Sequence, residues 1–176
     1  MSRVLFLTGT CGSGKSTVAS LLALEAGWKR ISEDELWQQR FGKDRGAFGT
    51  DEHRRKRHEI QAQVVDRIVA GLSAGASVVV DATIHESPPE AYLEYRALLE
   101  GLGIPWTLRI LHPRLDVAIA RDARRDGWSA GAARVSGLRA KFTEAVFPPA
   151  WFLDTSGESP AETAKRVLSA SRSLDR

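Results

Sequence analysis

A lysine and a serine end a glycine-rich stretch near the start of the sequence, and together these residue types can hold a polyphosphate. Residues Gly9–Ser16 read Gly-Thr-Cys-Gly-Ser-Gly-Lys-Ser, a full match to the pattern G-x-x-x-x-G-K-[ST]. The glycines let successive backbone N–H groups turn towards phosphate oxygens, the lysine reaches the β- and γ-phosphates, and the serine hydroxyl ligates Mg²⁺. We therefore predict that ATP and Mg²⁺ bind at this loop, through Gly9, Thr10, Cys11, Gly12, Ser13, Gly14, Lys15, Ser16 and Thr17.

The flanking residues support this interpretation because they supply a strand before the loop and a helix after it. Val4–Leu7 is a short apolar run of the kind that forms a buried strand. Val18, Leu21 and Leu22 follow the loop at helical spacing. The helix is therefore expected to begin near Gly14, where the positive end of its dipole favours a bound anion.

Two acidic residues lie at the ends of predicted strands, at the same edge of the expected sheet. Asp34 follows the short strand 28–32, and Asp81 ends the apolar run Val78–Val80. In an open α/β sheet this edge lines the ligand crevice. We predict that Asp81 helps Ser16 to hold Mg²⁺ through water, although an acidic residue at a strand end can also pair with a lysine.

Asp34 is the candidate for chemistry on a second substrate. Phosphoryl transfer depends mainly on positioning and charge neutralisation, so an exposed carboxylate can take the proton of an acceptor hydroxyl without a large change in its pKa. The alternative is that Asp34 caps a short helix over residues 35–41. Glu33 and Glu35 beside it are expected to lie in solvent, where one of them could join the water shell of Mg²⁺.

An arginine- and glycine-rich segment, residues 121–139, lies between the predicted fourth and fifth strands. Arg121 and Arg125 are four residues apart and would share one face of a helix. The arginine fork matches phosphate oxygens and stays charged, so we predict a lid whose arginines neutralise charge on the transferred phosphate. The alternative is a basic helix end that complements the helix dipole. Trp128 in this segment either covers the adenine or packs against the protein.

A second basic cluster, Arg54–Arg57, stands between His53 and His58 in a long predicted helix. Acidic neighbours in the same helix would make this a solvated face of ion pairs, which is the interpretation we favour. The alternative is a binding site for an anionic acceptor, and binding that weakens steeply with salt would reveal it. His85, beyond the third predicted strand, is expected to be structural.

The composition is that of an ordinary folded chain with one domain. Of the 176 residues, 43% are apolar and 27% are charged, and the net charge of +3 is too small to indicate nucleic-acid binding by itself. Cys11 is the only cysteine, so no intrachain disulfide can form and a reducing compartment fits. Because no apolar run approaches the length of a membrane span, we expect a cytoplasmic protein without a membrane partner. The oligomeric state and the choice between ATP and GTP are left open.

Predicted strands alternate with predicted helices along the whole chain, which favours a parallel sheet with right-handed crossovers. The strands are expected at residues 4–7, 28–32, 77–83, 105–111 and 151–154. The predicted fold class is α/β: a three-layer αβα P-loop NTPase fold with a five-stranded parallel sheet and an arginine-rich lid over about 121–139. A single domain is expected to span residues 1–176.

Four segments together resemble the small P-loop kinases, AAA-type ATP-binding kinases of the polynucleotide-kinase and chloramphenicol-phosphotransferase type: Gly9–Thr17, Ser32–Glu35, Val78–Thr83 and Arg121–Gly127. The resemblance implies that Asp34 is the general base on the acceptor hydroxyl. It also implies that Arg121 and Arg125, with Arg124 beside them, contact the ATP phosphates, and that the backbone of residues 155–160 contacts the adenine base.

The chain departs from the polynucleotide kinases at two points. Trp37 stands near the place where those enzymes usually carry an arginine that holds a substrate phosphate, and Arg40 lies one turn further on. The third predicted strand ends in Asp81-Ala82-Thr83, where those enzymes often have Asp-Thr-Asn. Both differences weigh against a phosphorylated nucleic-acid end as the acceptor.

The motifs and the resemblance together predict a kinase that transfers the γ-phosphate of ATP to a hydroxyl of a small molecule or of a nucleotide or polynucleotide end, with a small molecule favoured. No guanine-reading N-K-x-D string occurs, which argues against a regulatory GTPase. The alternative is a P-loop nucleotide-binding or ATPase module without its own acceptor. The expected catalytic residues are Lys15, Asp34, Arg121 and Arg125, with Arg121 also binding nucleotide and with Ser16 and Asp81 holding the metal.

Overall fold

Five parallel strands form a sheet in the order β2-β3-β1-β4-β5, and the parallel five-stranded sheet predicted from the sequence is confirmed. The computed structural model describes residues 2–84, 90–125, 129–144 and 147–172. Leu7 of β1 and Ser32 of β2 are both in register with Asp81 of β3, so these three strands end close together at one edge of the sheet. The strands are β1 (Val4–Gly9), β2 (Lys29–Ser32), β3 (Val78–Asp81), β4 (Trp106–Leu111) and β5 (Phe152–Leu153).

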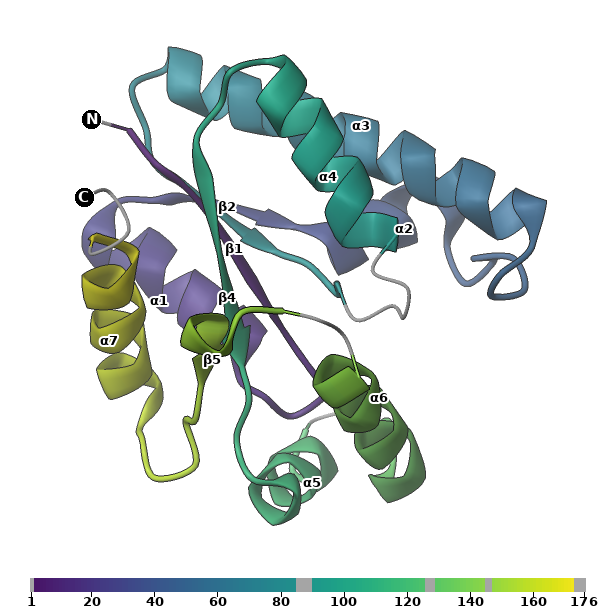
Figure 1. Cartoon of the computed structure of the whole chain (residues 1–176), viewed down its shortest axis with the longest axis vertical. Coiled ribbons are helices and arrows are strands. Elements are labelled where there is room, and N and C mark those ends of the chain that lie inside the picture. Colours follow the sequence, from purple (N-terminus) through teal and green to yellow (C-terminus); the bar gives the residue numbers. More distant parts are fainter. Residues whose placement is uncertain (1, 85–89, 126–128, 145–146, 173–176) are drawn as a thin grey trace.

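Helices cover both faces of the sheet and complete the three-layer fold (Figure 1). One face carries α1 (Lys15–Ala26) and α7 (Pro160–Arg172). The other carries α3 (Asp51–Ser73) and α4 (Glu90–Gly101), with the short α2 (Glu33–Phe41) directly after β2. Beyond the carboxyl ends of the strands, α5 (Leu115–Ala123) and α6 (Ala132–Glu144) contact each other, and a 3-10 turn (Pro149–Trp151) leads into β5.

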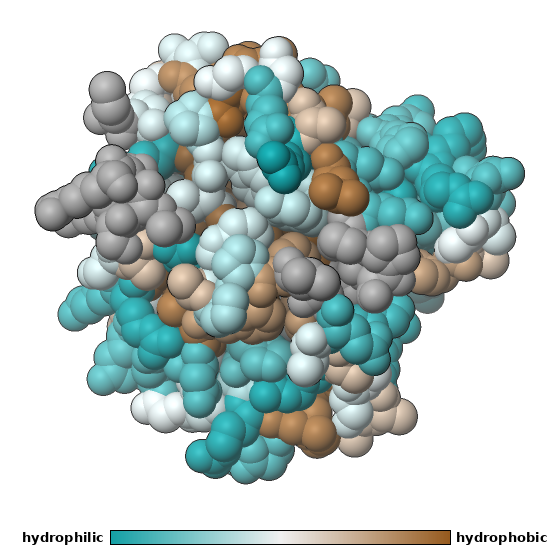
Figure 2. Space-filling view, in the orientation of Figure 1, coloured by the Kyte–Doolittle hydropathy of each residue, from teal (hydrophilic) through white to brown (hydrophobic). Residues whose placement is uncertain are grey.

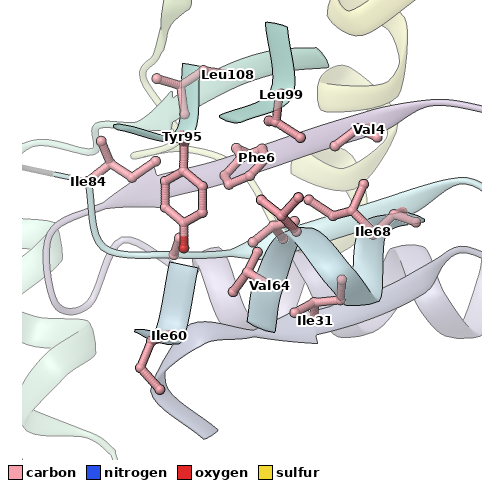
Figure 3. Packing of buried hydrophobic residues seen from close by; sticks show 14 of the residues in the cluster. Val4, Phe6, Ile31, Ile60, Val64, Ile68, Ile84, Tyr95, Leu99 and Leu108 are labelled. Carbon is pink, nitrogen blue, oxygen red and sulfur yellow. The ribbon is translucent and has the colours of Figure 1, made fainter. Parts of the chain in front are cut away.

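The alternation of side chains along β1 divides the core into two halves. Val4 and Phe6 pack on the α3–α4 side, Leu5 and Leu7 pack on the α1–α7 side, and none of the four is more than 2% exposed. Figure 3 shows the first half, where side chains from β1, α3 and α4 converge and the Tyr95 ring stands beside that of Phe6. Because the sheet is covered on both faces, β3 is buried along its whole length.

Local sequence signals place several helix ends as expected. α1 ends at Gly27, whose φ of 68° is the left-handed conformation that suits a glycine C-cap. Ser159 and Glu162 have the Ser-x-x-Glu spacing of a capping box and form one at the start of α7, because the Glu162 N–H donates to Ser159 Oγ and the Ser159 N–H donates to Glu162 Oε2. These local contacts fix where the helices start and stop, and therefore where the loops at the sheet edge begin.

The sequence also suggests Asp51 as the cap of α3, and this is wrong. Thr50 caps α3, since its Oγ1 accepts the N–H of His53, whereas Asp51 is the first residue of the helix. Ser87 and Glu90 have the Ser-x-x-Glu spacing of a capping box, but this stretch reaches into a part of the chain that the structure does not describe. Among the described residues, none of the helices has the length and apolarity needed to cross a membrane.

Gly12 provides a direct test of how closely the glycine-rich loop packs against α5. Its φ is 74°, and a Cβ atom at this position would lie 2.0 Å from the backbone oxygen of Ala118. Gly12→Ala should therefore displace the loop and lower the free energy of unfolding by about 1–3 kcal/mol. Chemical denaturation measures this loss, and calorimetric titration with ATP should show weaker binding.

Gly137→Ala is the matched control for this substitution. Gly137 lies inside α6, and a Cβ atom there would meet nothing within 4 Å. Alanine should therefore stabilise the helix by roughly 0.5–1 kcal/mol. If Gly12→Ala were as stable as Gly137→Ala, the close approach between the loop and α5 would be wrong.

Candidate active site

The glycine-rich loop between β1 and α1 has the backbone shape that a phosphate cradle needs. Gly9, Gly12 and Gly14 have φ values of 151°, 74° and 92°, which residues with a side chain rarely adopt. At Gly14 a Cβ atom would meet nothing within 4 Å, so the loop is open there. α1 starts at the next residue, and the unpaired N–H groups of its first turn lie beside this open part.

A cavity of about 290 Å³ opens over this loop. Its walls come from the loop and the start of α1, from two arginines at and just beyond the end of α5, and from the start of α7 with the loop before it. The structure thus brings the predicted lysine, serine and lid arginines to one place. The lining residues are Gly12, Ser13, Gly14, Lys15, Ser16, Thr17, Val18, Arg121, Arg125, Glu158, Pro160 and Thr163.

Gly9, Thr10 and Cys11 belong to the loop but do not line this cavity. A Cβ atom on Gly9 would lie 2.4 Å from the backbone oxygen of Leu111, so the chain can leave β1 beside β4 only with glycine here. Thr10 is fully buried, and its hydroxyl donates to the backbone oxygen of Val135 in α6 at 3.2 Å. Cys11 is a half-buried free thiol. Their contact with nucleotide stays a prediction.

The lid arginines reach the cavity from different local structures. Arg121 lies in the last turn of α5, and its guanidinium donates to the backbone oxygens of Thr155 and Glu158 at 2.9 and 3.2 Å. α5 ends at Ala123, so Arg125 lies beyond the helix, and the prediction that both arginines share one helix face is wrong. Arg121 therefore connects the lid with the loop between β5 and α7.

Asp122 anchors the start of the lid. Its carboxylate is buried, accepts the Ser129 hydroxyl at 2.7 Å and the Gly131 N–H at 3.1 Å, and lies 3.5 Å from Arg125. Burial alone would raise the pKa of Asp122, but these partners outweigh it and hold the pKa below its usual value. Asp122 therefore stays ionised at neutral pH and holds Arg125, Ser129 and Gly131 of the lid in place. Trp128 falls outside the described residues.

Ser16 and Asp81 fit a magnesium site that phosphate oxygens and water would complete. Ser16 lines the cavity, and Asp81 is paired in register with Leu7 of β1, the strand that leads into the loop. The Oδ1 atom of Asp81 is buried and has no hydrogen-bond partner among the described residues, so it can accept from a metal-bound water. Mg²⁺ usually keeps several waters and takes only one or two protein carboxylates. The other carboxylate oxygen lies 3.6 Å from Arg30, so Asp81 also has an ion-pair partner, which is an arginine and not the lysine named as the alternative.

Asp34 stands in the first turn of α2, at the exit of β2, with its carboxylate exposed. It does not cap the helix, because Ser32 does: the Ser32 Oγ accepts the N–H of Glu35 at 3.3 Å. Glu35 is exposed as expected. Asp34 instead forms an ion pair of 3.0 Å with Arg45, from the loop between α2 and α3. The cavity over the glycine-rich loop does not reach Asp34, so a position facing the phosphates stays a prediction.

Aromatic rings support Arg45 beside Asp34. The Arg45 guanidinium lies 5.5 Å from the centre of the Trp37 ring, and the His53 ring stacks on the same indole at 5.6 Å. The Nδ1 atom of His53 lies 2.9 Å from the backbone oxygen of Arg45. Trp37 stands where the resemblance led us to expect an arginine, and it holds an arginine that comes from a different segment.

The loop that carries Arg45 also contacts α6. Lys141 of α6 places its Nζ atom 4.8 Å from the ring centre of Phe48, in the same loop. Near the other end of this helix, the backbone oxygen of Val135 accepts the hydroxyl of Thr10. Helix α6 therefore links the phosphate cradle with the loop that contains Arg45.

Glu33 contradicts the expectation that it lies in solvent, since it is only 7% exposed. Its Oε2 atom accepts the Thr83 N–H at 3.0 Å, and its Oε1 atom accepts the Tyr95 hydroxyl at 2.9 Å. Burial, reinforced by the charges of Asp34 and Asp81 and opposed by the two hydrogen bonds, raises the pKa of Glu33 to about 7. The edge of the sheet therefore holds a third carboxylate, which is buried and titrates near neutrality.

The basic run of α3 is occupied by ion pairs. Lys56 Nζ lies 2.8 Å from Asp44 and 2.9 Å from Glu52, and Arg57 Nη2 lies 2.8 Å from Glu94 of α4. Lys56 and Arg57 are buried, so the expectation of a solvated face is wrong for these two residues. Figure 2 shows that the surface over this projecting end of the molecule is hydrophilic. With acidic partners already in place, the run gives no support to a site for an anionic acceptor.

Sequence reasoning missed Arg45 and Tyr95, and it misplaced Glu33. Arg45 lies in a glycine-rich loop where no periodicity reveals the direction of a side chain. Tyr95 occupies a helical position that marks it only as part of the core. For Glu33 a signal was available, because Ser32 and Glu35 have the Ser-x-x-Glu spacing of a capping box, which starts the helix at Glu33 and not two residues later.

The raised pKa of Glu33 predicts a pH dependence of stability. Its usual pKa is 4.5 and its folded value is about 7, so the stability contributed by the protonated form is present below about pH 4.5 and is lost as the pH rises through about 7. Glu33→Gln retains an oxygen for the Thr83 N–H and an N–H for the Tyr95 oxygen, but it cannot ionise. Above about pH 8 this variant should be more stable than the wild type by on the order of 2–3 kcal/mol.

Urea denaturation across this pH range measures the difference, which should shrink towards zero near pH 4.5. Glu25→Gln is the matched control, because Glu25 is exposed on α1. Parallel stability profiles for the wild type and Glu33→Gln would show that Glu33 does not titrate near neutrality.

Comparisons with known proteins agree with this geometry. The sequence profile of a family described as "AAA domain" matches residues 4–145. The chain is 26% identical to a protein named "Putative adenylate kinase" of Thermococcus onnurineus over 178 residues, which cover 97% of this chain and 84% of that protein. The fold is similar to that of a sugar kinase from a Janibacter species (TM-score 0.68, 23% identity, 96% of this chain and 94% of the other).

It is also similar to a shikimate kinase from Acinetobacter baumannii, solved in complex with shikimate (TM-score 0.67, 16% identity, 99% of this chain and 95% of the other). These structural likenesses show a fold shared with P-loop kinases. Because the family profile spans most of the sequence, from β1 to the end of α6, the chain belongs to the AAA domain family.

Proposed function

We propose that this protein is an ATP-dependent kinase that transfers the γ-phosphate of ATP to a hydroxyl group of a small molecule. The observation that carries the proposal is the cavity over the glycine-rich loop, where Lys15 and Ser16 share the walls with Arg121 and Arg125. A backbone cradle, a lysine, a metal-binding hydroxyl and two arginines are the parts that phosphoryl transfer requires. The exposed carboxylate of Asp34 at a neighbouring strand end supports a second substrate on that side.

In this proposal the loop and the lid share the charge of the triphosphate. The backbone N–H groups from Gly12 to Ser16 and the Lys15 ammonium hold the β- and γ-phosphates. Arg125, which pairs with the anchored Asp122, neutralises the charge that develops during transfer. Arg121 holds the loop at Thr155 and Glu158, and so shapes the cavity wall beyond the phosphates. Bound Mg²⁺, held by Ser16 and through water by Asp81, would supply charge neutralisation between the β- and γ-phosphates.

Asp34 is proposed to hold the acceptor hydroxyl and take its proton. The oxygen of the hydroxyl forms a bond to the γ-phosphorus, the bond between that phosphorus and the β–γ bridging oxygen breaks, and ADP leaves with that oxygen. The proton of the hydroxyl passes to the Asp34 carboxylate. An exposed carboxylate can do this because the proton moves late in the transfer.

Several contacts favour a small acceptor over a nucleic-acid end. The hydrogen bond of α6 with Thr10 and its cation–π contact with Phe48 connect the cradle to the loop beside Asp34, which favours an enclosed acceptor site over an open groove. The basic run of α3 is engaged by acidic partners instead of being presented to a phosphate backbone. The likeness to a sugar kinase and to a shikimate-bound kinase fits the same size of acceptor.

A second candidate function is transfer to the phosphate group of a nucleoside monophosphate. It is favoured by the 26% identity with the protein named as an adenylate kinase, and by Arg45, a cation beside Asp34 that could pair with a phosphate. A phosphate oxygen carries no proton at neutral pH, so such a reaction would not need Asp34 as a base. The remaining alternative, an ATPase module without an acceptor, would hydrolyse ATP at a rate that no acceptor raises.

The experiment that separates these functions combines an acceptor panel with Asp34→Asn. ADP release from Mg·ATP is measured with sugars, sugar acids, aminoalcohols, nucleosides and nucleoside monophosphates. We expect one class of hydroxyl compound to stimulate turnover, and Asp34→Asn to lower that stimulated rate by about 100-fold or more while ATP affinity stays within about two-fold. Asp66→Asn, a change of the same type at an exposed position of α3, is the control.

Three outcomes of this experiment would count against a hydroxyl kinase. Stimulation by a nucleoside monophosphate that survives Asp34→Asn would support the second candidate. Slow hydrolysis that no compound raises would support the ATPase module. Full turnover of a hydroxyl acceptor by Asp34→Asn would remove the role of Asp34 as base.

Arg125→Ala tests whether Arg125 acts on the charge of the transferred phosphate and not on nucleotide binding. Because Arg125 is proposed to act on charge that appears during transfer, its loss should lower kcat by about 100-fold with less than about a three-fold change in the Kd of ATP. Arg114→Ala serves as the control, since Arg114 is an exposed arginine that pairs with Asp116 at the start of α5. Calorimetric Kd values and steady-state rates provide the two numbers. Equal losses in affinity and in kcat/KM would mean that Arg125 only binds nucleotide.

A further inference from the structure

Glu33 is connected to both of the carboxylates that the proposed function uses. It is the first residue of α2, so Asp34 follows it directly in the chain. Through the Thr83 N–H it also holds the chain two residues beyond Asp81. Arg30 also reaches both elements, since its guanidinium lies 2.7 Å from Glu35 of α2 and 3.6 Å from Asp81. Glu33 differs because it belongs to α2 itself and binds the backbone of the β3 exit, and it has no role in the proposed transfer.

The exit of β3 is held by alternate backbone groups on its two sides. On the β1 side, the Ala82 N–H donates to the backbone oxygen of Leu7 at 3.1 Å, and the Ile84 N–H donates to Thr8 Oγ1 at 2.9 Å. Thr83 lies between them, so its N–H faces the β2 side, as expected for extended backbone. β2 has already ended at Ser32 and offers no backbone acceptor there. The Glu33 carboxylate takes the place of the missing strand partner.

The second oxygen of Glu33 is fixed by α4. The Tyr95 hydroxyl donates to Oε1 at 2.9 Å, and Tyr95 is fully buried with its ring 4.9 Å from that of Phe6. Burial, and next the charge of Glu33, raise the pKa of Tyr95 well above its usual value, so the hydroxyl remains a donor. Both oxygens of one carboxylate thus join α2, the β3 exit and α4.

We propose that Glu33 is a positioning residue that sets the separation between Asp34 and Asp81, by serving as a substitute strand partner for Thr83 and as the acceptor for Tyr95. This proposal rests on the proposed function, in which Asp34 handles the acceptor and Asp81 holds the metal through water. Displacing the β3 exit moves Asp81, and displacing the first turn of α2 moves Asp34. A displacement of about 1 Å of a group that positions a substrate or metal can lower the reaction rate on the order of 100-fold.

The test compares Glu33→Ala, Tyr95→Phe and Glu33→Gln with the wild type. Glu33→Ala removes both hydrogen bonds, Tyr95→Phe removes one, and Glu33→Gln can restore both with its amide. Two quantities are measured: kcat and KM with the acceptor found by the panel, and the Mg²⁺ concentration at which ATP binding is half-maximal. The second needs no acceptor, and Glu25→Ala on the exposed face of α1 is the matched control.

We expect Glu33→Ala to lower kcat by about 100-fold and to raise the required Mg²⁺ concentration by about ten-fold, with KM for ATP within about two-fold. Tyr95→Phe should change both quantities in the same direction but less. Glu33→Gln should recover most of both, because the amide keeps the geometry without the charge. Circular dichroism and thermal melting establish that each variant is folded. If Glu33→Ala does not fold, the kcat and the Mg²⁺ requirement of Tyr95→Phe decide whether the proposal holds.

Two results would overturn the proposal. Folded Glu33→Ala or Tyr95→Phe with wild-type kcat and wild-type Mg²⁺ requirement would show that the β3 exit needs no such partner. Glu33→Gln as impaired as Glu33→Ala would show that the charge of Glu33 matters and not its position. If the wild type phosphorylates no acceptor, the proposed function fails by itself, and the Mg²⁺ requirement still decides the role of Glu33.

Discussion

The parallel register of β1, β2 and β3 is the constraint on which the rest of the structure depends. Leu7 and Ser32 flank Asp81 in the sheet, so the glycine-rich loop, the first turn of α2 and the exit of β3 all begin at one edge. Parallel strands place their carboxyl ends at the same edge of the sheet, and helices on both faces shield the strands from solvent. Phosphate-binding groups and carboxylates that are far apart in the sequence therefore become neighbours without any long-range side-chain contact.

Close packing makes this edge specific. A Cβ atom on Gly9 would collide with the backbone of β4, and a Cβ atom on Gly12 would collide with the backbone of α5. The loop therefore has one available path between these two elements. In the same helix, Arg121 contacts the loop before α7, and Asp122 accepts hydrogen bonds from Ser129 and Gly131 of the lid. The lid is thus attached to the cradle at its base. The geometry explains why a glycine motif and an arginine segment more than 100 residues apart share one cavity.

The acidic residues at the sheet edge are each stabilised differently. Asp34 is exposed and paired with Arg45, Asp81 is buried with Arg30 near one oxygen, and Glu33 is buried with neutral donors. Burial is the main reason that the pKa of Glu33 rises to about 7, and repulsion from the charges of Asp34 and Asp81 adds to it. A bound divalent cation would relieve this repulsion, so the electrostatics of the edge are consistent with metal-dependent nucleotide binding.

Periodicity and motif spacing were enough to predict the five parallel strands, the layers and the cavity-lining part of the loop. Each of these depends on short-range pattern: apolar runs for strands, helical spacing for α1 and α3, and a glycine pattern for the loop. The wrong helix ends were local errors, whereas the unforeseen side-chain contacts have a common cause, because their partners are distant in the sequence. The burial of Glu33 depends on Tyr95, that of Arg57 depends on Glu94, and the place of Arg45 depends on Trp37.

In the proposed kinase, a triphosphate in the glycine-rich loop faces Asp34 across a space that fits one acceptor hydroxyl. A crystal structure of the wild-type protein with Mg²⁺ and a non-hydrolysable ATP analogue would show whether it does. We expect the γ-phosphate to point towards the α2 side, with the Asp34 carboxylate one hydroxyl group away from it and Arg45 turned to the acceptor space. A γ-phosphate directed to bulk solvent, with Asp34 turned away and protein atoms filling the space between them, would contradict it.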